Sequence, residues 1–140
     1  MFVGRERELE SLQRLYASNS FQFGVVYGRR RVGKTKLLRQ FTADKPDVFF
    51  FTAHETTLSE NLDLLSRELA KTTPDDQPAS YPVFRTLTEA FDEVFRRAAS
   101  KRLVFVIDEY PYLAQSDPGA SSALQALIDA NQEDSKLLLI

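Results

Sequence analysis

The sequence has no cysteine and only one histidine among its 140 residues. A chain without cysteine can form neither a disulfide nor a thiolate metal site, and one histidine cannot supply a site of several histidines. Long apolar runs are also lacking, because residues 103–107 and 137–140, the longest such runs, are far too short to cross a bilayer. Charged residues at positions 5–8 leave no room for a signal-peptide core. These absences predict a soluble, cytoplasmic protein with no membrane partner.

A surplus of charge of one sign is missing as well. Lysine and arginine number 18 against 20 aspartate and glutamate residues, which gives a formal net charge of -2. Proteins that bind the phosphate backbone of nucleic acids usually carry a surplus of basic residues, so the composition does not support a nucleic-acid partner. The apolar share of 43% is typical of a globular protein, and the length is that of one domain with a real core.

Two kinds of segment alternate along the chain. Short apolar runs, rich in β-branched and aromatic residues, are typical of strands buried on both faces and occupy residues 23–27, 48–52, 103–107 and 137–140. Between them, apolar residues recur at helical spacing in stretches that begin near residues 9, 36, 58, 87 and 118. Strands that alternate with helices predict an α/β fold of three layers, in which a parallel sheet lies between two layers of helices.

Several sequence signals set the limits of these segments. The spacing of a capping box occurs twice, at Thr57 with Glu60 and at Thr86 with Glu89. Asp117 before Pro118 predicts a helix that the aspartate caps and the proline begins. Residues 72–83 contain three prolines and are expected to form a long loop. A linker between two domains is the alternative, but the helices on either side need the same sheet to cover their apolar faces.

A glycine-rich segment between the first strand and the next helix fits the pattern G-x-x-x-x-G-K-[ST]. Its residues are Gly28, Arg29, Arg30, Arg31, Val32, Gly33, Lys34 and Thr35. Glycines let the backbone curl so that successive N–H groups point at an anion, and the following helix adds the positive end of its dipole. We therefore expect a phosphate-binding loop, in which Lys34 reaches the β- and γ-phosphates and Thr35 ligates Mg²⁺.

The alternative for this segment is a glycine turn with a solvated basic run. Its place directly after a strand and directly before a helix favours the phosphate loop, because that is the setting the chemistry requires. Arg29, Arg30 and Arg31 occupy the variable positions of the loop, where the backbone binds the phosphates. Their side chains are therefore expected to face solvent.

The third strand ends in two carboxylates, Asp108 and Glu109. A strand buried on both faces does not normally end in paired acids unless its tip meets a cation or a reactive water. In phosphoryl transfer, Asp108 would hold Mg²⁺ through its water shell, and Glu109 would orient the attacking water or accept its proton. The alternative is that the two acids only begin a turn ahead of Pro111.

Two consecutive acids also bear on the class of reaction. A second carboxylate suits the activation of water and therefore hydrolysis of a nucleoside triphosphate, which is our first hypothesis. The alternatives are an interaction switch that binds ATP and scarcely hydrolyses it and, with less support, a P-loop kinase. Neither Asn-Lys-x-Asp nor Asp-x-x-Gly occurs in the chain. Since the usual guanine-reading and GTPase switch elements are missing, ATP is the expected nucleotide.

Two further segments of the sequence are similar to segments of a known family. The chain opens with Phe2-Val3-Gly4-Arg5-Glu6, and the acidic pair continues as Asp108-Glu109-Tyr110-Pro111-Tyr112-Leu113. With these segments the whole chain resembles the prokaryotic archaeal-type ATPases. These are additional-strand, catalytic-glutamate P-loop ATPases near the STAND and origin-recognition branches of AAA+ proteins. The resemblance implies that residues 27–35 form the Walker A motif and that residues 106–113 form Walker B with its extension.

The resemblance also implies contacts with other parts of the nucleotide. By analogy Val3, Gly4 and Arg5 lie beside the adenine, although they could equally do no more than begin a surface helix. His54 and Thr52 are candidates for sensing the γ-phosphate, because strand ends in such sheets face the ligand. For His54 the alternative is a plain surface position, since a loop histidine with no visible partner is more often of that kind.

Finally, the resemblance implies the sheet order 5-1-4-3-2. In that order residues 136–140 are the fourth strand, and the fifth strand, the sensor 1 residue and the helical lid lie outside the sequence. We therefore expect residues 1–140 to be the N-terminal part of an AAA+-like P-loop ATPase domain, with a C-terminal lid or effector domain as its partner. An unpaired edge at residues 23–27 would favour self-association. Without an identifiable arginine finger, we expect the chain alone to bind Mg·ATP and hydrolyse it slowly.

Overall fold

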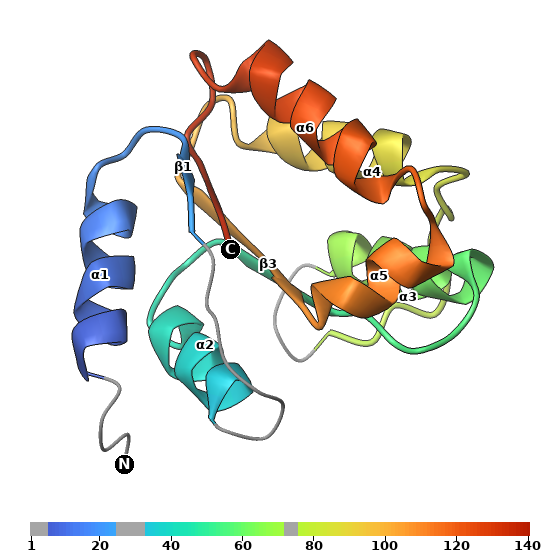
Figure 1. The fold of residues 1–140 in the computed structure, drawn as a ribbon, viewed down its shortest axis with the longest axis horizontal. Coiled ribbons are helices and arrows are strands. Elements are labelled where there is room, and N and C mark those ends of the chain that lie inside the picture. The colour runs from blue at the N-terminus through green and yellow to red at the C-terminus, as the bar shows by residue number, and fades with distance from the viewer. Residues whose placement is uncertain (1–5, 25–32, 72–75) are drawn as a thin grey trace.

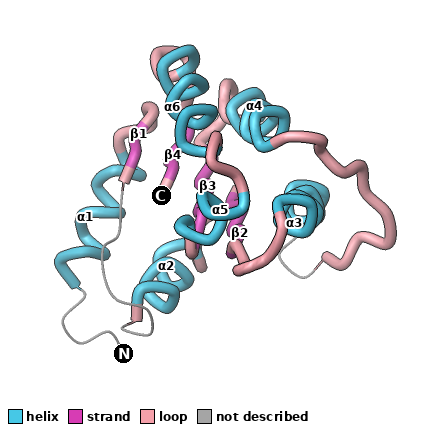
Figure 2. The backbone as a smooth tube through the Cα atoms, turned by 45° about the vertical axis from the view of Figure 1, so that its right-hand side comes forward, coloured by secondary structure: helices cyan, strands magenta, loops and turns pink. Residues whose placement is uncertain are grey.

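A parallel sheet forms the centre of the computed structural model, which describes residues 6–24, 33–71 and 76–140. Within these residues the sheet has four strands in the order β1-β4-β3-β2 (Figures 1 and 2). The strands are β1 (Gln22–Phe23), β2 (Val48–Thr52), β3 (Leu103–Asp108) and β4 (Leu137–Leu139). The helices are α1 (Glu6–Ala17), α2 (Lys34–Thr42), α3 (Leu58–Ala70), α4 (Leu87–Arg97), α5 (Tyr110–Ser116) and α6 (Ala120–Asn131). The predicted three-layer α/β fold is therefore confirmed.

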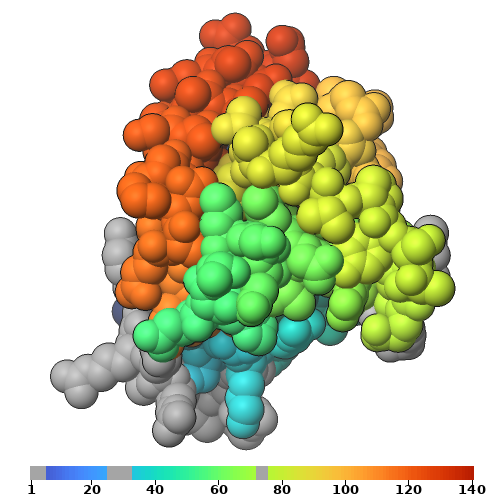
Figure 3. All heavy atoms as spheres, turned by 90° about the vertical axis from the view of Figure 1, so that its right-hand side faces the viewer, coloured from blue at the N-terminus to red at the C-terminus, as the bar shows by residue number. Residues whose placement is uncertain are grey.

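The sheet has helices on both faces because its strands are apolar on both sides. Along β3, Phe105 points into the larger apolar cluster with α3, α4 and α6, whereas Val104 and Val106 point into the smaller cluster with α1 and α2. In the same way Leu139 and Leu138 of β4 face opposite clusters. This alternation follows from strand geometry, because successive side chains of a strand point to opposite faces of the sheet. Figure 3 shows the outer surface of the helical layer that contains α3, α4 and α6.

The order of the strands follows from the faces that the connecting helices use. The connection from β1 to β2 runs across the sheet through α2 on one face. The connections from β2 to β3 and from β3 to β4 run back in the opposite direction, through helices on the other face. A change of direction together with a change of face keeps one handedness for all the crossovers, as parallel strands require. The expected order 1-4-3-2 is found for these four strands.

The limits of the strands agree closely with the sequence prediction. β2 covers residues 48–52 as expected, β3 extends one residue further to Asp108, and β4 ends one residue earlier at Leu139. Directly after β1, the Gly24 N–H continues the pairing by donating to the Leu139 carbonyl at 2.9 Å. The remainder of the predicted first strand, residues 25–27, lies outside the described residues.

The two predicted capping boxes are half formed. The hydroxyl oxygens of Thr57 and Thr86 accept the N–H groups of residues 60 and 89 at 3.2 and 3.1 Å. The glutamates do not return the bond to the capping threonines. The Glu60 carboxylate bonds the Thr56 hydroxyl instead, and the Glu89 carboxylate accepts the Arg85 N–H at 3.5 Å. Each helix is therefore fixed at its start by the threonine.

One expectation about the segment after β3 was wrong, and one helix was missed. The helix predicted to begin at Pro118 begins at Ala120, because the Asp117 side chain accepts the Gly119 N–H at 2.9 Å and holds residues 117–119 in a turn. In addition, α5 was not predicted at all. It has only seven residues, includes Pro111, and has too few apolar positions to show a helical period.

The predicted loop after α3 is present in the described residues from 76 to 86. Tyr81 donates a hydrogen bond to the Asp63 carboxylate at 2.8 Å, and the Phe84 N–H donates to the Ser66 hydroxyl at 3.0 Å. Both acceptors belong to α3, so the loop is fixed along that helix. In the described part of the chain, no helix combines the length and the apolar character needed to cross a membrane.

Candidate functional site

The start of α2 is shaped by a glycine in the left-handed region. Gly33 has φ 88° and ψ 7° and directly precedes the helix, and its carbonyl accepts the Leu37 N–H at 2.9 Å. A Cβ at this position would meet no atom within 4 Å, so the backbone conformation alone favours glycine here. The first N–H groups of a helix have no partner within it and form the positive end of its dipole. This end of α2 is therefore suited to an anion.

The end of β3 brings a buried carboxylate to the same place. Asp108 is 2% exposed, and its Oδ2 accepts a hydrogen bond from the Thr35 hydroxyl at 2.9 Å. Its Oδ1 is buried and has no hydrogen-bond partner, unlike every other buried side-chain oxygen or nitrogen in the described residues. A buried carboxylate oxygen without a partner is costly unless a cation or a water binds it. This oxygen therefore marks a place for a ligand.

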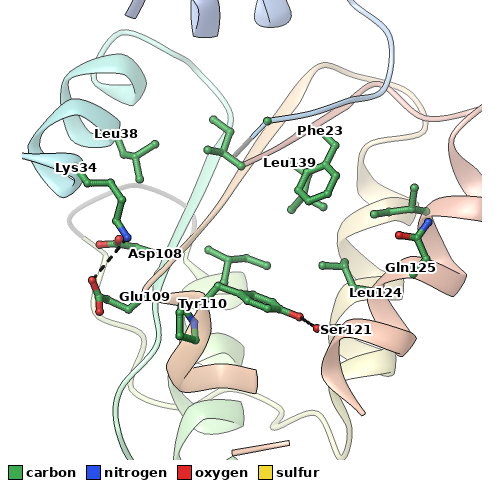
Figure 4. Close-up of a pocket in the computed structure, with 15 residues that line it drawn as sticks. Phe23, Lys34, Leu38, Asp108, Glu109, Tyr110, Ser121, Leu124, Gln125 and Leu139 are labelled. Atoms are coloured by element: carbon green, nitrogen blue, oxygen red, sulfur yellow. Dashed lines mark hydrogen bonds and ion pairs between the residues drawn. The ribbon is translucent and has the colours of Figure 1, made fainter. Parts of the chain in front are cut away.

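The next residue, Glu109, lies between β3 and α5. Its backbone has φ 61° and ψ 40°, the left-handed region that residues other than glycine rarely adopt. Its Oε1 lies 4.0 Å from Nζ of Lys34, and both side chains are 19% exposed. Figure 4 shows the two side chains pointing toward each other across the site, beside Asp108. Residues 34 and 109 thus meet although 75 positions separate them in the sequence.

A cavity of 530 Å³ lies beside these charged groups. One end of it is formed by Lys34, Asp108 and Glu109. Most of the remaining wall is apolar and comes from β1, β4, α5 and α6, with Phe23, Leu139, Tyr110 and Leu124 among its residues (Figure 4). Phe23 is 52% exposed at the β1 edge of the described sheet.

The loop after β2 lies beside the end of β3. Thr52 is paired with Asp108 in the register of β2 and β3, and the Ala53 N–H donates to the Asp108 carbonyl at 2.9 Å. The main chain of His54 is held by Asn61, whose Oδ1 accepts the His54 N–H at 3.0 Å and whose Nδ2 donates to the His54 carbonyl at 3.2 Å. The His54 side chain is exposed. The structure thus fixes the backbone of this loop next to Asp108.

Asn61 is a residue that the sequence analysis missed. It is fully buried, and its Nδ2 also lies 3.4 Å from the Ser116 hydroxyl at the end of α5. A signal for it existed in the sequence, because Asn61 lies three residues after Leu58 and four before Leu65, on the apolar stripe of the predicted helix. A polar residue on such a stripe must find hydrogen-bond partners inside the fold.

The structure brings together four of the residues singled out from the sequence, namely Lys34, Thr35, Asp108 and Glu109. Gly33 lies at the start of the same helix. The other residues predicted to bind the nucleotide directly fall outside the described residues; they are Val3, Gly4, Arg5, Gly28, Arg29, Arg30, Arg31 and Val32.

The oxygen atoms of Thr35 and Asp108 suit a hard cation. Over the ranges that the structure describes, no three His, Cys, Asp or Glu side chains gather into a metal-binding group. A protein cage for a metal is therefore not formed by these residues. Mg²⁺ does not need one, because it is usually held by one or two protein oxygens, several waters and the phosphates of a substrate. The partnerless Oδ1 of Asp108 fits such a site.

Known proteins resemble the chain over part or all of its length. A family model described as an ATPase domain predominantly from Archaea matches residues 2–140. An uncharacterized protein of Methanocaldococcus jannaschii is 31% identical over 140 residues, which is 100% of this chain and 29% of the relative. An uncharacterized ATP-binding protein of the same organism is 49% identical over 45 residues, which is 32% of this chain and 76% of the relative. No solved structure matches the chain.

Proposed function

Because the chain belongs to the family of ATPase domains that come predominantly from Archaea, we propose that residues 28–35 bind the phosphates of ATP and that Asp108 and Glu109 serve its hydrolysis. The observation that carries this proposal is the meeting of two distant segments. The start of α2 supplies a lysine and a hydroxyl, and the end of β3 supplies two carboxylates within reach of them. Phosphoryl transfer needs these groups at one place.

The phosphates are bound by the backbone and by Lys34. Gly33 turns the chain into α2, so that the free N–H groups at the start of the helix point at an anion. The Lys34 ammonium adds a positive charge, and it lies at the mouth of the same site. Binding of a triphosphate draws this ammonium toward the phosphate oxygens, which carry more charge than the single carboxylate of Glu109.

The Thr35 hydroxyl would ligate Mg²⁺, and Asp108 would hold it through its water shell. When bound, Mg²⁺ neutralises the charge of the phosphate oxygens. The Thr35 hydroxyl donates to Asp108 Oδ2 at 2.9 Å, so the two side chains that would hold the metal lie side by side. Burial of Asp108 at the end of β3 fixes its side chain, since the strands on both sides of β3 hold the backbone in place.

Glu109 acts on the attacking water. As the residue after Asp108, it extends toward the space in front of Lys34, where the terminal phosphate would lie. There its carboxylate accepts a proton from the water or orients it. Hydrolysis then changes the charge at the start of α2 and at the end of β3, and we propose that this difference alters the conformation of the module.

The finer position of the chain among P-loop ATPases is proposed as well. The resemblance of residues 2–6 and 106–113 to archaeal-type ATPases supports a place near the STAND and origin-recognition branches of AAA+ proteins, and so does the strand order. The chain spans about 29% of the length of the first relative. In a protein as long as this relative, we propose that the nucleotide state acts on the part of the protein outside these 140 residues. Hydrolysis of ATP fits a cytoplasmic location.

The first experiment tests nucleotide binding. Titration calorimetry compares the chain with Lys34→Ala, and Lys36→Ala serves as a matched control because Lys36 is exposed two residues further along α2. We expect Lys34→Ala to weaken Mg·ATP binding by roughly 10- to 100-fold, the equivalent of a charge-assisted hydrogen bond, and Lys36→Ala to have little effect. Unchanged affinity in Lys34→Ala, or no heat from the unaltered chain, would contradict the proposal.

The second experiment separates a hydrolase from a switch. Glu109→Gln keeps the size of the side chain and removes its basic carboxylate, so we expect ATP binding to be retained and turnover to fall by about 10²- to 10⁴-fold. Release of phosphate is the measurement. If the unaltered chain binds ATP and Glu109→Gln does not change its turnover, the chain is an interaction switch. Transfer of phosphate to an added acceptor without release of free phosphate would indicate a kinase.

A further inference from the structure

The backbone of Glu109 is held in a conformation that it would not adopt by itself. A side chain in the left-handed region crowds the following carbonyl, which disfavours this region for every residue except glycine and, to a lesser degree, asparagine and aspartate. Such a residue persists only where its surroundings determine its conformation. Contacts near Glu109 must therefore hold its backbone at φ 61° and ψ 40°.

The first turn of α5 supplies one of these contacts. The Tyr112 N–H donates to the Glu109 carbonyl at 3.0 Å, so Glu109 caps the helix through its backbone. The far end of α5 is also fixed, because Leu113 is fully buried and the Ser116 hydroxyl lies 3.4 Å from Asn61. The start of the helix then needs its own anchor, since Pro111 is exposed and offers no N–H group.

Tyr110 provides that anchor. Its ring packs against the larger apolar cluster, and its hydroxyl forms a hydrogen bond of 2.6 Å with the Ser121 hydroxyl in the first turn of α6. Figure 4 shows the ring extending away from the acidic pair toward α6, along the wall of the cavity. α6 is a firm support, because Ala120 and Leu124 on either side of Ser121 are buried.

We propose that Tyr110 is a positioning residue, which together with Ser121 holds Glu109 in its left-handed conformation and thereby aims its carboxylate. The inference rests on the proposed function, since it assumes that the Glu109 carboxylate acts on water. A carboxylate that acts as a base must lie within hydrogen-bonding reach of the water, so a shift of a few tenths of an ångström weakens it. We expect the binding of ATP to depend little on the Tyr110 hydroxyl, because the start of α2 is held by the bond from the Leu37 N–H to the Gly33 carbonyl and by the bond from Thr35 to Asp108.

The test removes each hydroxyl in turn. Tyr110→Phe and Ser121→Ala should each lower kcat about threefold to tenfold, the effect of one lost hydrogen bond, and should leave the Kd for Mg·ATP unchanged. The double variant should be no slower than either single variant, because both changes break the same bond. Tyr81→Phe is the matched control: it removes a tyrosine hydroxyl that bonds Asp63 at 2.8 Å on α3, and its kcat should not change.

Three results would overturn the inference. These are an unchanged kcat in Tyr110→Phe, effects of the two single variants that multiply in the double variant, and a loss of Mg·ATP affinity as large as the loss of kcat. The last result would show that Tyr110 has a general structural role. A measurement that does not depend on turnover completes the test. The three-bond coupling between HN and Hα of Glu109, measured by NMR, should change in Tyr110→Phe and remain the same in Tyr81→Phe.

The inference and the proposed function can fail separately. If Glu109→Gln abolishes turnover whereas Tyr110→Phe changes neither kcat nor the coupling of Glu109, the inference is wrong and the proposed function stands. If Glu109→Gln leaves turnover unaltered, the role of Glu109 in hydrolysis is wrong. A change in the coupling of Glu109 in Tyr110→Phe would then still show that the tyrosine holds the backbone, and the proposed effect on catalysis would be overturned.

Discussion

Gly33 and Glu109 have the same place in two halves of the site. Each directly precedes a helix, α2 in one case and α5 in the other, and each has a positive φ, 88° and 61° respectively. Their side chains are opposites: one residue has none, and the other carries a carboxylate that reaches to 4.0 Å from Lys34. The same backbone geometry is thus obtained at low cost in one half and under strain in the other.

The difference reflects what each half contributes. At the start of α2 the useful groups are backbone N–H groups, which every residue has, so a glycine that adopts the left-handed region easily is sufficient. At the start of α5 the proposed function needs a carboxylate at that point in space. Glycine cannot supply it, and the chain accepts a strain of about 1–2 kcal/mol. Backbone strain at a residue other than glycine therefore indicates a functional position. The start of α2 shows no such strain, because its left-handed residue is a glycine.

A large effect on turnover is expected where the two halves touch, at the hydrogen bond between Thr35 and Asp108. Asp108→Asn keeps an oxygen that can accept this bond and removes the charge that Mg²⁺ needs. We expect turnover to fall about 100-fold, because the metal supplies several kcal/mol of stabilisation. The free energy of unfolding without metal should not fall, since the substitution removes a negative charge that is buried and has one oxygen without a partner.

Turnover as a function of Mg²⁺ concentration, together with urea unfolding in a chelator, gives both values. Asp129→Asn is the control, because this carboxylate lies on the exposed face of α6 and accepts a bond from Gln125 at 2.9 Å. An Asp108→Asn variant that needs no more Mg²⁺ than the unaltered chain and hydrolyses ATP as fast would remove Asp108 from the site.

The next effect concerns the unstrained half. Gly33→Ala should lower the free energy of unfolding by about 1–2 kcal/mol, because alanine must then adopt φ 88° although its Cβ would have room. Urea unfolding is the measurement. Gly119→Ala is a matched control, since Gly119 also precedes a helix but has φ -87°, which alanine adopts without strain. Equal losses in the two variants would show that φ at position 33 is not the reason for glycine.

The smallest change in the free energy of unfolding is expected for the reverse change in the strained half. Glu109→Gly removes the strain and adds the entropy cost of glycine, so we expect the free energy of unfolding to rise by at most about 1 kcal/mol while turnover is lost. Asn19→Gly is the control at φ 53°, where the gain should be smaller because asparagine tolerates this region. A Glu109→Gly variant that is clearly less stable would mean that side-chain contacts of Glu109 outweigh its strain.

Much of the fold could be predicted from the sequence, because its strongest signals are local and periodic. Continuous apolar runs located β2 and β3 to within one residue, and stripes of apolar residues at helical spacing located α3 and α4. α5 could not be found in this way. A helix of seven residues with a proline near its start makes too few turns to show a period, so residues 109–111 look like a turn in the sequence. The structure shows that Leu113 of this helix is fully buried in the larger apolar cluster.

Some residues of the candidate site could also be predicted from the sequence, and others could not. Lys34, Thr35, Asp108 and Glu109 could be named from the sequence because each belongs to a motif with fixed spacing. Asn61 and the bond between Tyr110 and Ser121 could not, since Asn61 reaches Ser116 from 55 positions away and the second bond depends on where α6 packs. Such partners are fixed by packing, and spacing along the chain carries no record of them.

The sequence by itself determined the alternation of strands and helices, the two apolar faces of the strands and the motifs at their ends, because these depend on neighbouring residues alone. Only the tertiary structure decided that the start of α2 and the end of β3 meet, that one oxygen of Asp108 is buried without a partner, and that Glu109 is strained. The physical reason is that distance, burial and backbone strain arise when segments far apart in the chain pack against one another.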